Sequence, residues 1–322
     1  MWLLLKYTLL YASVLALVAL GGMFSERSGV INIALDGIMV IGGLMGVVMI
    51  NLMNAWGVPV FLGLIVTILV SALAGLVYSS LLAFSAINLK ADQTIGGTAL
   101  NLLATAIAMV IAKRINGNDS PKITYSTNTN ALFNNSHFSF NVGPVTLNWF
   151  LLVTLVAIAA AWFILYRTRF GMRLMACGEH PQAADSVGIN VYKMRWAGVL
   201  MSGALGGIGG MAYIVPAVGD WNFEMGVAGM GFLALAVMIF GNWKPLNIAL
   251  ASLLFGLFKC IAAAYSTLDI NGDGIYALAE LGISSHLYRM LPFLVTLVVL
   301  AFTSKKSRAP KAEGIPYDKG SR

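Results

Sequence analysis

Apolar stretches long enough to cross a membrane recur along almost the whole chain. A transmembrane helix needs about 20 mostly apolar residues. Stretches of this kind cover residues 3–20, 29–50, 60–84, 95–112, 147–166, 194–215, 226–241, 246–265 and 286–303. Only 10% of the residues are charged, against about 25% in soluble domains. We therefore expect an all-α, polytopic membrane protein with about nine spans. This excludes soluble enzymes and, despite a net charge of +7, nucleic-acid-binding domains.

Basic residues indicate the orientation, because cytoplasmic loops carry an excess of Lys and Arg. The residues after Thr303 include Lys305, Lys306, Arg308, Lys311, Lys319 and Arg322. If this tail is cytoplasmic, counting back through the spans puts segment 167–195 in the cytoplasm and the N-terminus outside. The chain then consists of a transmembrane domain over residues 1–304 and a basic cytoplasmic tail over 305–322. The external loops are expected at 113–146 and 266–285.

Two turns that contain Trp and Pro indicate an internal repeat. Residues 54–59 (NAWGVP) end one span, and the next span contains SALAGL at 71–76. Residues 242–245 (NWKP) end a later span, and the next contains SLLFGL at 252–257. In the expected orientation the first turn faces outside and the second faces inside. Spans one to four and six to nine are therefore expected to be inverted repeats, which is typical of alternating-access transporters with a site near the midplane.

Polar residues within or beside the spans are candidates for a substrate pathway, because they are costly at membrane depth. Asn32 and Asp36 share one helix face, and Gly29 and Gly37 can interrupt the helix around them. Either this stretch lines the pathway at a broken helix, or Asp36 caps a half-helix or pairs with Arg27. Two further clusters suit a polar, ring-bearing ligand or ordinary anchoring at the membrane interface. Together the candidate pathway residues are Asn32, Asp36, Thr94, Asn101, Asn222 and Glu224.

Residues 269–280 match the calcium-loop pattern D-x-[DN]-x-[DN]-G-x5-E. Oxygen ligands would come from Asp269, Asn271, Asp273 and Glu280. EF-hand loops normally lie between amphipathic helices and occur in pairs, whereas this one lies alone between two spans. An external turn rich in Asp, Asn and Gly explains the pattern without a metal ion, so we assign no metal to it.

Motifs that would indicate catalysis are absent from the sequence. It contains no phosphate-binding G-x-x-x-x-G-K-[ST] loop, no H-E-x-x-H and no G-x-S-x-G. We therefore expect a protein that is not an enzyme and has no cofactor of its own. Energy for active transport would come from an ion gradient or from a partner. One hypothesis is an ion-coupled secondary transporter of a small polar solute that uses Asp36.

The segment 167–195 is polar, lies between two spans and is patterned to fold. Phe170, Leu174 and Cys177 share one helix face, and Gly178 can end that helix. Pro181 suits the first turn of a second helix, which continues until Gly188. We therefore expect two short helices at the membrane surface, where they can fill a groove on a soluble partner.

Three separate motifs resemble one family. Residues 168–171 (TRFG), 176–184 (ACGEHPQAA) and 188–189 (GI) are similar to the coupling region of bacterial ABC importer permeases that handle branched-chain amino acids, ribose-type sugars and nucleosides. Residues 25–39 (SERSGVINIALDGIM) and 314–320 (GIPYDKG) resemble segments typical of the nucleoside group. The resemblance covers nearly the whole chain.

This resemblance implies a type II ABC importer fold in the bacterial cell membrane and import of nucleosides or related sugar-like solutes. It also implies three partners: a cytoplasmic ATP-binding subunit that holds ATP and Mg²⁺, a second permease subunit, and an extracellular substrate-binding lipoprotein or periplasmic protein. The residues implied in coupling to the ATPase are Gly178, Glu179, Pro181, Ala183, Ala184, Gly188 and Ile189.

Overall fold

The computed structural model describes residues 2–125, 135–143, 145–216, 220–265, 284–303 and 308–320. In this part of the chain, 8 helical segments are long and apolar enough to cross a membrane. They are built on α1 (Trp2–Arg27), α2 (Leu35–Ala55), α3 (Val60–Ala83), α4 (Gln93–Asn116), α5 (Trp149–Arg167), α8 (Val191–Ile214), α9 (Met230–Phe240) and α10 (Pro245–Ala264). A further apolar helix, α12 (Ser285–Thr303), packs against α10. These helices confirm the expected all-α membrane protein.

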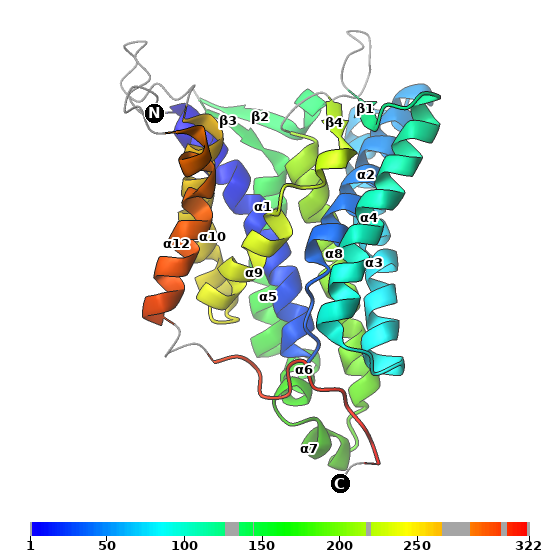
Figure 1. Cartoon of the computed structure of the whole chain (residues 1–322), viewed down its shortest axis with the longest axis vertical. Helices are drawn as coiled ribbons and strands as arrows, with labels where there is room; N and C mark the ends of the chain where they lie inside the picture. Colours follow the sequence, from blue (N-terminus) through cyan, green and yellow to red (C-terminus); the bar gives the residue numbers. More distant parts are fainter. Residues whose placement is uncertain are drawn as a thin grey trace.

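The long helices run between two opposite faces of the molecule (Figure 1). One face carries the short helices α6 (Arg169–Glu179) and α7 (Pro181–Ser186), together with the C-terminal residues. The other, which we call the strand face, carries the N-terminus and two small antiparallel sheets. Their strands are β1 (Lys122–Thr124), β2 (Ser139–Val142), β3 (Val145–Asn148) and β4 (Asp220–Asn222). Segment 167–195 and the C-terminal tail therefore share a face, as the sequence predicts.

The two predicted repeats are visible as two interlocked sets of helices. Helix α8 packs against α2 and α3, and α1 packs in the same way against α9 and α10. Each set thus takes its central helix from the other set, and α1 and α8 also pack together. The α2–α3 turn lies at the strand face, and the α9–α10 turn lies toward the α6–α7 face (Figure 1). The two sets are therefore inverted relative to each other.

Glycines allow the central helices to approach closely. A Cβ atom on Gly207 of α8 would overlap the carbonyl oxygen of Ser71 in α3, and one on Gly75 would overlap that of Gly203. In lipid, van der Waals packing between small residues drives helix association, because no hydrophobic effect operates between helices. The contact between α3 and α8 therefore depends on these glycines.

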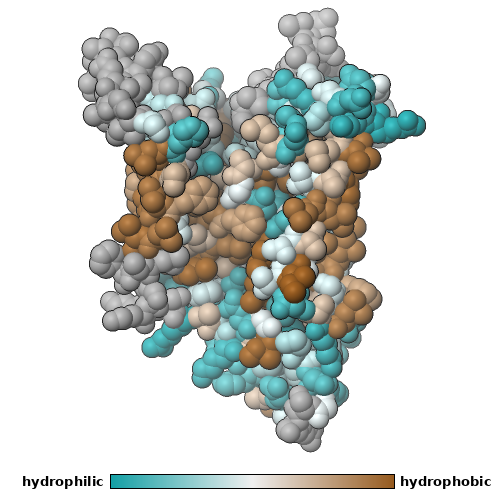
Figure 2. Space-filling view, in the orientation of Figure 1, coloured by the Kyte–Doolittle hydropathy of each residue, from teal (hydrophilic) through white to brown (hydrophobic). Residues whose placement is uncertain are grey.

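The polarity of the surface differs between the middle of the molecule and its two ends. Figure 2 shows an apolar band across the middle of the face it draws and hydrophilic residues at both ends. Exposed apolar side chains of the spanning helices include Leu69, Leu73, Leu102, Val110 and Val156. Such a band matches the hydrocarbon layer of a bilayer.

Replacing Gly207 by Ala should destabilise the protein by about 1–3 kcal/mol, because the added methyl group meets the α3 backbone. Gly96→Ala is the matched control, since a Cβ there lies 3.4 Å from its nearest neighbour, Ser85 Oγ. This control should be neutral or stabilising by up to about 1 kcal/mol. Thermal unfolding in detergent measures both. Equal midpoints would show that the α3–α8 contact is loose.

Candidate functional site

Helix α2 begins later than the sequence predicts, because its approach is not helical. The predicted span starts at residue 29, but residues 28–34 form turns and extended chain before the helix. Side chains of α4 bind the backbone there: Ile31 N–H donates to Gln93 Oε1 at 2.7 Å, and Asn101 Nδ2 donates to Ile33 C=O at 2.9 Å. Asn101 Oδ1 also accepts from Gly37 N–H at 2.7 Å. Because backbone groups in a membrane need partners, these two side chains permit the interruption.

Helix α9 is interrupted in the same way on the inverted half. Its predicted span starts at residue 226, but the helix begins at Met230, after Gly226, Ala228 and Gly229 with φ angles of 56°, 52° and 71°. The first turn of α9 meets the first turn of α2, where Gly231 N–H donates to Asp36 Oδ1 at 2.9 Å. Asp36 therefore caps a half-helix, as one interpretation predicted, and that helix is α9.

The alternative pairing of Asp36 with Arg27 is wrong. Arg27 instead donates from Nη2 and Nε to the carbonyl of Trp243, at 3.0 and 3.3 Å.

We call this region the midspan junction and define it as residues 31–37, residues 229–231, and the α4 side chains Gln93 and Asn101. Two helix N-termini meet here, and each carries a partial positive charge from its unpaired N–H groups. Broken helices of this kind form binding sites in many transporters. On the molecular surface, neutral and hydrophilic residues interrupt the apolar band between α9 and α4 (Figure 2).

The structure brings three of the six predicted pathway residues, Asn32, Asp36 and Asn101, into the midspan junction. Asn32 is fully buried and donates to Ser202 Oγ at 2.8 Å, and its Oδ1 has no partner among the described residues.

Thr94 lies on the same face of α4 as Asn101. Thr98 and Thr105 continue this face at helical spacing, and together these residues form a polar stripe. Gln93, which precedes the predicted span 95–112 in the same polar cluster as Thr94, also belongs to the junction through its bond to Ile31 N–H.

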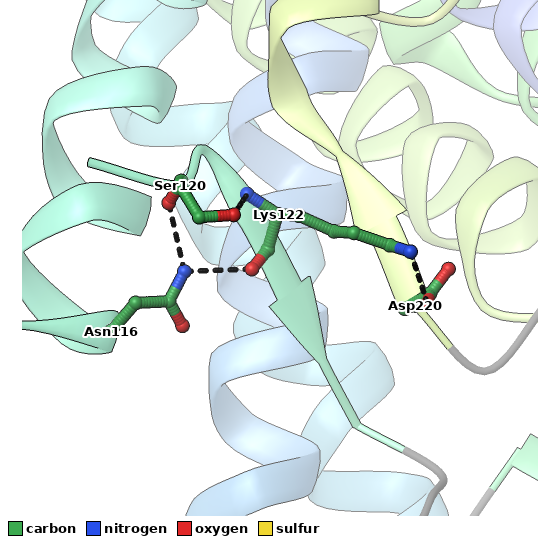
Figure 3. Close-up of polar contacts among 4 residues, drawn as sticks. All are labelled: Asn116, Ser120, Lys122 and Asp220. Carbon is green, nitrogen blue, oxygen red and sulfur yellow. Dashed lines mark hydrogen bonds and ion pairs between the residues drawn. The ribbon is translucent and has the colours of Figure 1, made fainter. Parts of the chain in front are cut away.

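The other two pathway residues, Asn222 and Glu224, lie away from the junction, at the strand face. There β1, within the expected external loop 113–146, pairs with β4, and Ile123 lies opposite Trp221. Lys122 Nζ lies 2.6 Å from Asp220 Oδ2, and Asn116 Nδ2 donates to the carbonyls of Ser120 and Lys122 (Figure 3). This ladder joins the end of α4 to the segment that leads into α9. Three-residue strands have no periodicity that a sequence could reveal.

Segment 167–195 forms the two predicted helices, α6 and α7. Thr168 Oγ1 accepts from Gly171 N–H at 3.2 Å, and Pro181 occupies the first turn of α7. Cys177 is fully buried, and burial raises the pKa of its thiol to about 11, so the group is a neutral packing residue.

The seven residues implied in ATPase coupling divide by exposure. Gly178 is buried with its α-carbon close to the backbone of Arg27, so a larger residue there would collide with α1. Pro181 and Ala184 are also buried. Ala183 and Gly188 are exposed, and Glu179 and Ile189 are half-buried. The exposed group is available to a partner, while the buried group fixes α6 and α7 against the membrane domain.

The predicted calcium-loop residues Asp269, Asn271, Asp273 and Glu280 lie outside the described part of the chain. Within the described residues, no group of three or more His, Cys, Asp or Glu side chains could hold a metal ion. The structure therefore gives no test of that loop.

Replacing Asn101 by Ala should leave Gly37 N–H and Ile33 C=O without partners, at a cost of about 1–3 kcal/mol for each group. Leu102→Ala is the control on the next residue, because the Leu102 side chain is 76% exposed on the apolar surface. Denaturant unfolding in detergent should separate the two variants by more than 1 kcal/mol. If the two variants are equally stable, Asn101 does not hold the interruption.

Comparisons with known proteins give the family. The model of the branched-chain amino acid transport system permease component matches residues 4–300. A nucleoside ABC transporter permease protein of Lactococcus lactis, NupC, is 39% identical and covers 97% of this chain and 95% of its own. A guanosine ABC transporter permease protein of Bacillus subtilis, NupQ, is 38% identical over 98% of this chain and 96% of its own. The L. lactis permease NupB is 27% identical over 45% of this chain and 39% of its own. No solved structure matches. The chain therefore belongs to the family of branched-chain amino acid transport system permease components.

Proposed function

We propose that this chain is a transmembrane permease subunit of an ABC importer that moves nucleosides into the cell. Two relatives that match almost the full chain are named for nucleoside and guanosine transport, and this observation carries the substrate class. The fold supports transport, because inverted halves with two interrupted helices can alternate between states that open to opposite faces. Uptake of guanosine into proteoliposomes that contain the complete transporter tests the proposal.

In this proposal the midspan junction lines the pathway. Its amide and carboxylate groups can exchange hydrogen bonds with the hydroxyl and ring groups of a nucleoside. The polar stripe of α4, from Thr94 to Thr105, leads along the same face toward the strand face. Asn222 and Glu224 would contact solute or a delivery protein at the strand face. The residues that bind substrate would therefore come from α2, α4 and the segment before α9.

The α6–α7 face would be cytoplasmic and would receive the ATP-binding subunit. Basic residues support this orientation, because the face carries Arg167, Arg169, Arg173, Lys193 and the C-terminal tail. ATP and Mg²⁺ would bind on that subunit, and its movement would drive the permease. A substrate-binding lipoprotein or periplasmic protein would dock on the strand face.

A second, non-identical permease subunit would complete the pathway. The supporting observation is that L. lactis has NupC and NupB, two permeases that both match this chain to different extents. The polar residues on the face drawn in Figure 2 support a second subunit that covers the midspan junction, since they would otherwise contact lipid. An isolated polar stripe in hydrocarbon is costly, so a second subunit would cover it.

Ala183→Arg should reduce co-purification of the ATP-binding subunit at least tenfold, because it places a large charged side chain on the exposed side of α7. Asp119→Arg introduces the same side chain at an exposed position on the strand face and should have no effect. Quantitative pull-down from membranes measures both. Equal recovery of the ATP-binding subunit with the two variants would remove α7 from the docking surface.

Asp36→Asn tests the alternative of an ion-coupled transporter. The amide Oδ1 of Asn can still accept from Gly231 N–H, so uptake by an ABC importer should persist within a few fold and survive a protonophore. In an ion-coupled transporter that uses this carboxylate, the same change would abolish uptake, and uptake by the unmodified protein would need no ATP. Vesicle uptake with and without ATP therefore separates the two mechanisms.

A further inference from the structure

We propose that residues 308–318 form a tether that passes movement of α6 and α7 to the turns and the interrupted helix on the same face. Transport would then depend on the tether, whereas docking of the ATP-binding subunit would not. This inference rests on the proposed function. It concerns a segment that composition alone presents as a basic tail.

Backbone hydrogen bonds attach the tether to three separate elements. Ala312 N–H donates to Gly178 C=O in α6 at 2.8 Å. Gly314 N–H donates to Gly29 C=O, before α2, at 3.3 Å. Arg308 N–H donates to Asn242 Oδ1 in the α9–α10 turn at 3.1 Å. The tether thus contacts α6, the approach to α2 and the end of α9 within a few residues.

Tyr317 fixes the end of the tether beneath the docking helices. Its side chain is 5% exposed and packs with Cys177 of α6, Ala184 of α7 and Val191 of α8. The ring centroid lies 5.3 Å from that of Tyr192, with the planes at 64°. The hydroxyl lies near the Asp185 carboxylate. One aromatic side chain therefore joins the tail to α6, α7 and α8.

Arg195 links the tether to α8 and to the approach to α2. The side chain is 1% exposed, and Nη1 donates to Ile315 C=O at 2.9 Å. Its Nε and Nη2 have no hydrogen-bond partner among the described residues. A Cβ on Gly29 would lie 2.8 Å from Nη2, and Gly29 has a φ of 96°, a conformation that favours Gly beside the guanidinium. A buried charge with so few partners needs the Ile315 carbonyl, because an unpaired buried cation is strongly unfavourable.

Glu313 adds a link to the end of α1. Its carboxyl group lies beside that of Glu26, which accepts from Trp243 Nε1 at 2.6 Å. Burial raises the pKa of Glu313. The tether therefore meets α1 and the α9–α10 turn at one point. The ion pair of Lys90 with Asp318, 3.2 Å long and largely exposed, adds little.

Together these contacts connect α6 and α7, through the tether, to both inverted halves of the fold. Helix α6 packs on α1, α5 and α8. The tether, which is bonded to α6, also contacts the α9–α10 turn and the approach to α2. Movement of α6 and α7 would therefore pull on both inverted halves. Without the tether, α6 and α7 could still bind a partner but would transmit less movement to α2 and α9.

Tyr317→Ala tests the tether in the complete transporter reconstituted with ATP and guanosine. The expected result is an at least tenfold fall in guanosine taken up per ATP hydrolysed, with co-purification of the ATP-binding subunit within twofold of the unmodified protein. Ile315→Ala is the matched control, because that side chain is 56% exposed and only its carbonyl contacts Arg195. This control should keep the original ratio.

Two outcomes overturn the tether. In one, Tyr317→Ala and Ile315→Ala have the same ratio of uptake to hydrolysis. In the other, Tyr317→Ala loses the ATP-binding subunit together with uptake, which would make Tyr317 a docking residue. A failure of the proposed function is distinct, since the unmodified transporter would then show no ATP-dependent uptake.

Hydrogen exchange on the unmodified complex provides a test that does not depend on any variant folding. The amides of Ala312 and Gly314 should exchange slowly, and their protection should change together with that of α6 when a non-hydrolysable ATP analogue binds. Exchange of these two amides at the rate of a free peptide would overturn the tether.

Discussion

Every backbone polar group in the hydrocarbon layer needs a partner within the protein. The interruptions before α2 and α9 are possible because side chains supply these partners. Gln93 and Asn101 of α4 bind the approach to α2, and Asp36 of α2 binds the first turn of α9. The two halves of the fold are therefore joined at the depth where each is broken. This arrangement places polar groups and two helix N-termini at one point in the membrane.

The rest of the structure supports that point from both faces. At the strand face, the β1–β4 ladder and the ion pair of Lys122 with Asp220 join the end of α4 to the segment before α9. At the opposite face, α6 and the C-terminal segment contact the approach to α2 and the α9–α10 turn. Glycines bring α3 and α8 into close contact between the two faces. The junction is therefore held from both faces by packed, hydrogen-bonded elements.

Much of this architecture can be predicted from the sequence, because membrane spans follow from apolar length. The helix pair α6 and α7 follows from Gly178 and Pro181, and the inverted repeat follows from the two turns with Trp and Pro. The partners of polar residues cannot be predicted in this way. Asp36 binds Gly231, which is 195 residues away, and Arg27 binds the Trp243 carbonyl. Tertiary contacts across the two halves decide these pairings, and no local pattern encodes them.

The burial of Tyr317 and the close neighbour of Gly178 could not be predicted either, because the composition around these residues does not indicate their contacts. The C-terminal residues look like a charged, solvated tail, yet Tyr317 is buried between α6, α7 and α8. Gly178 resembles a helix terminator, and the structure adds that no side chain fits between it and Arg27. In both cases the sequence shows the residue type but not the neighbour that requires it.

The account depends most on the claim that the polar stripe of α4 lines a water-accessible pathway. Thiol labelling tests this directly, because the native Cys177 and Cys260 are buried and can be replaced first. In the assembled transporter, Thr98→Cys should react with a membrane-impermeant reagent and be protected by guanosine. Leu103→Cys is exposed on the other side of α4 and should not react. Labelling of Leu103→Cys with Thr98→Cys unreactive would contradict the account.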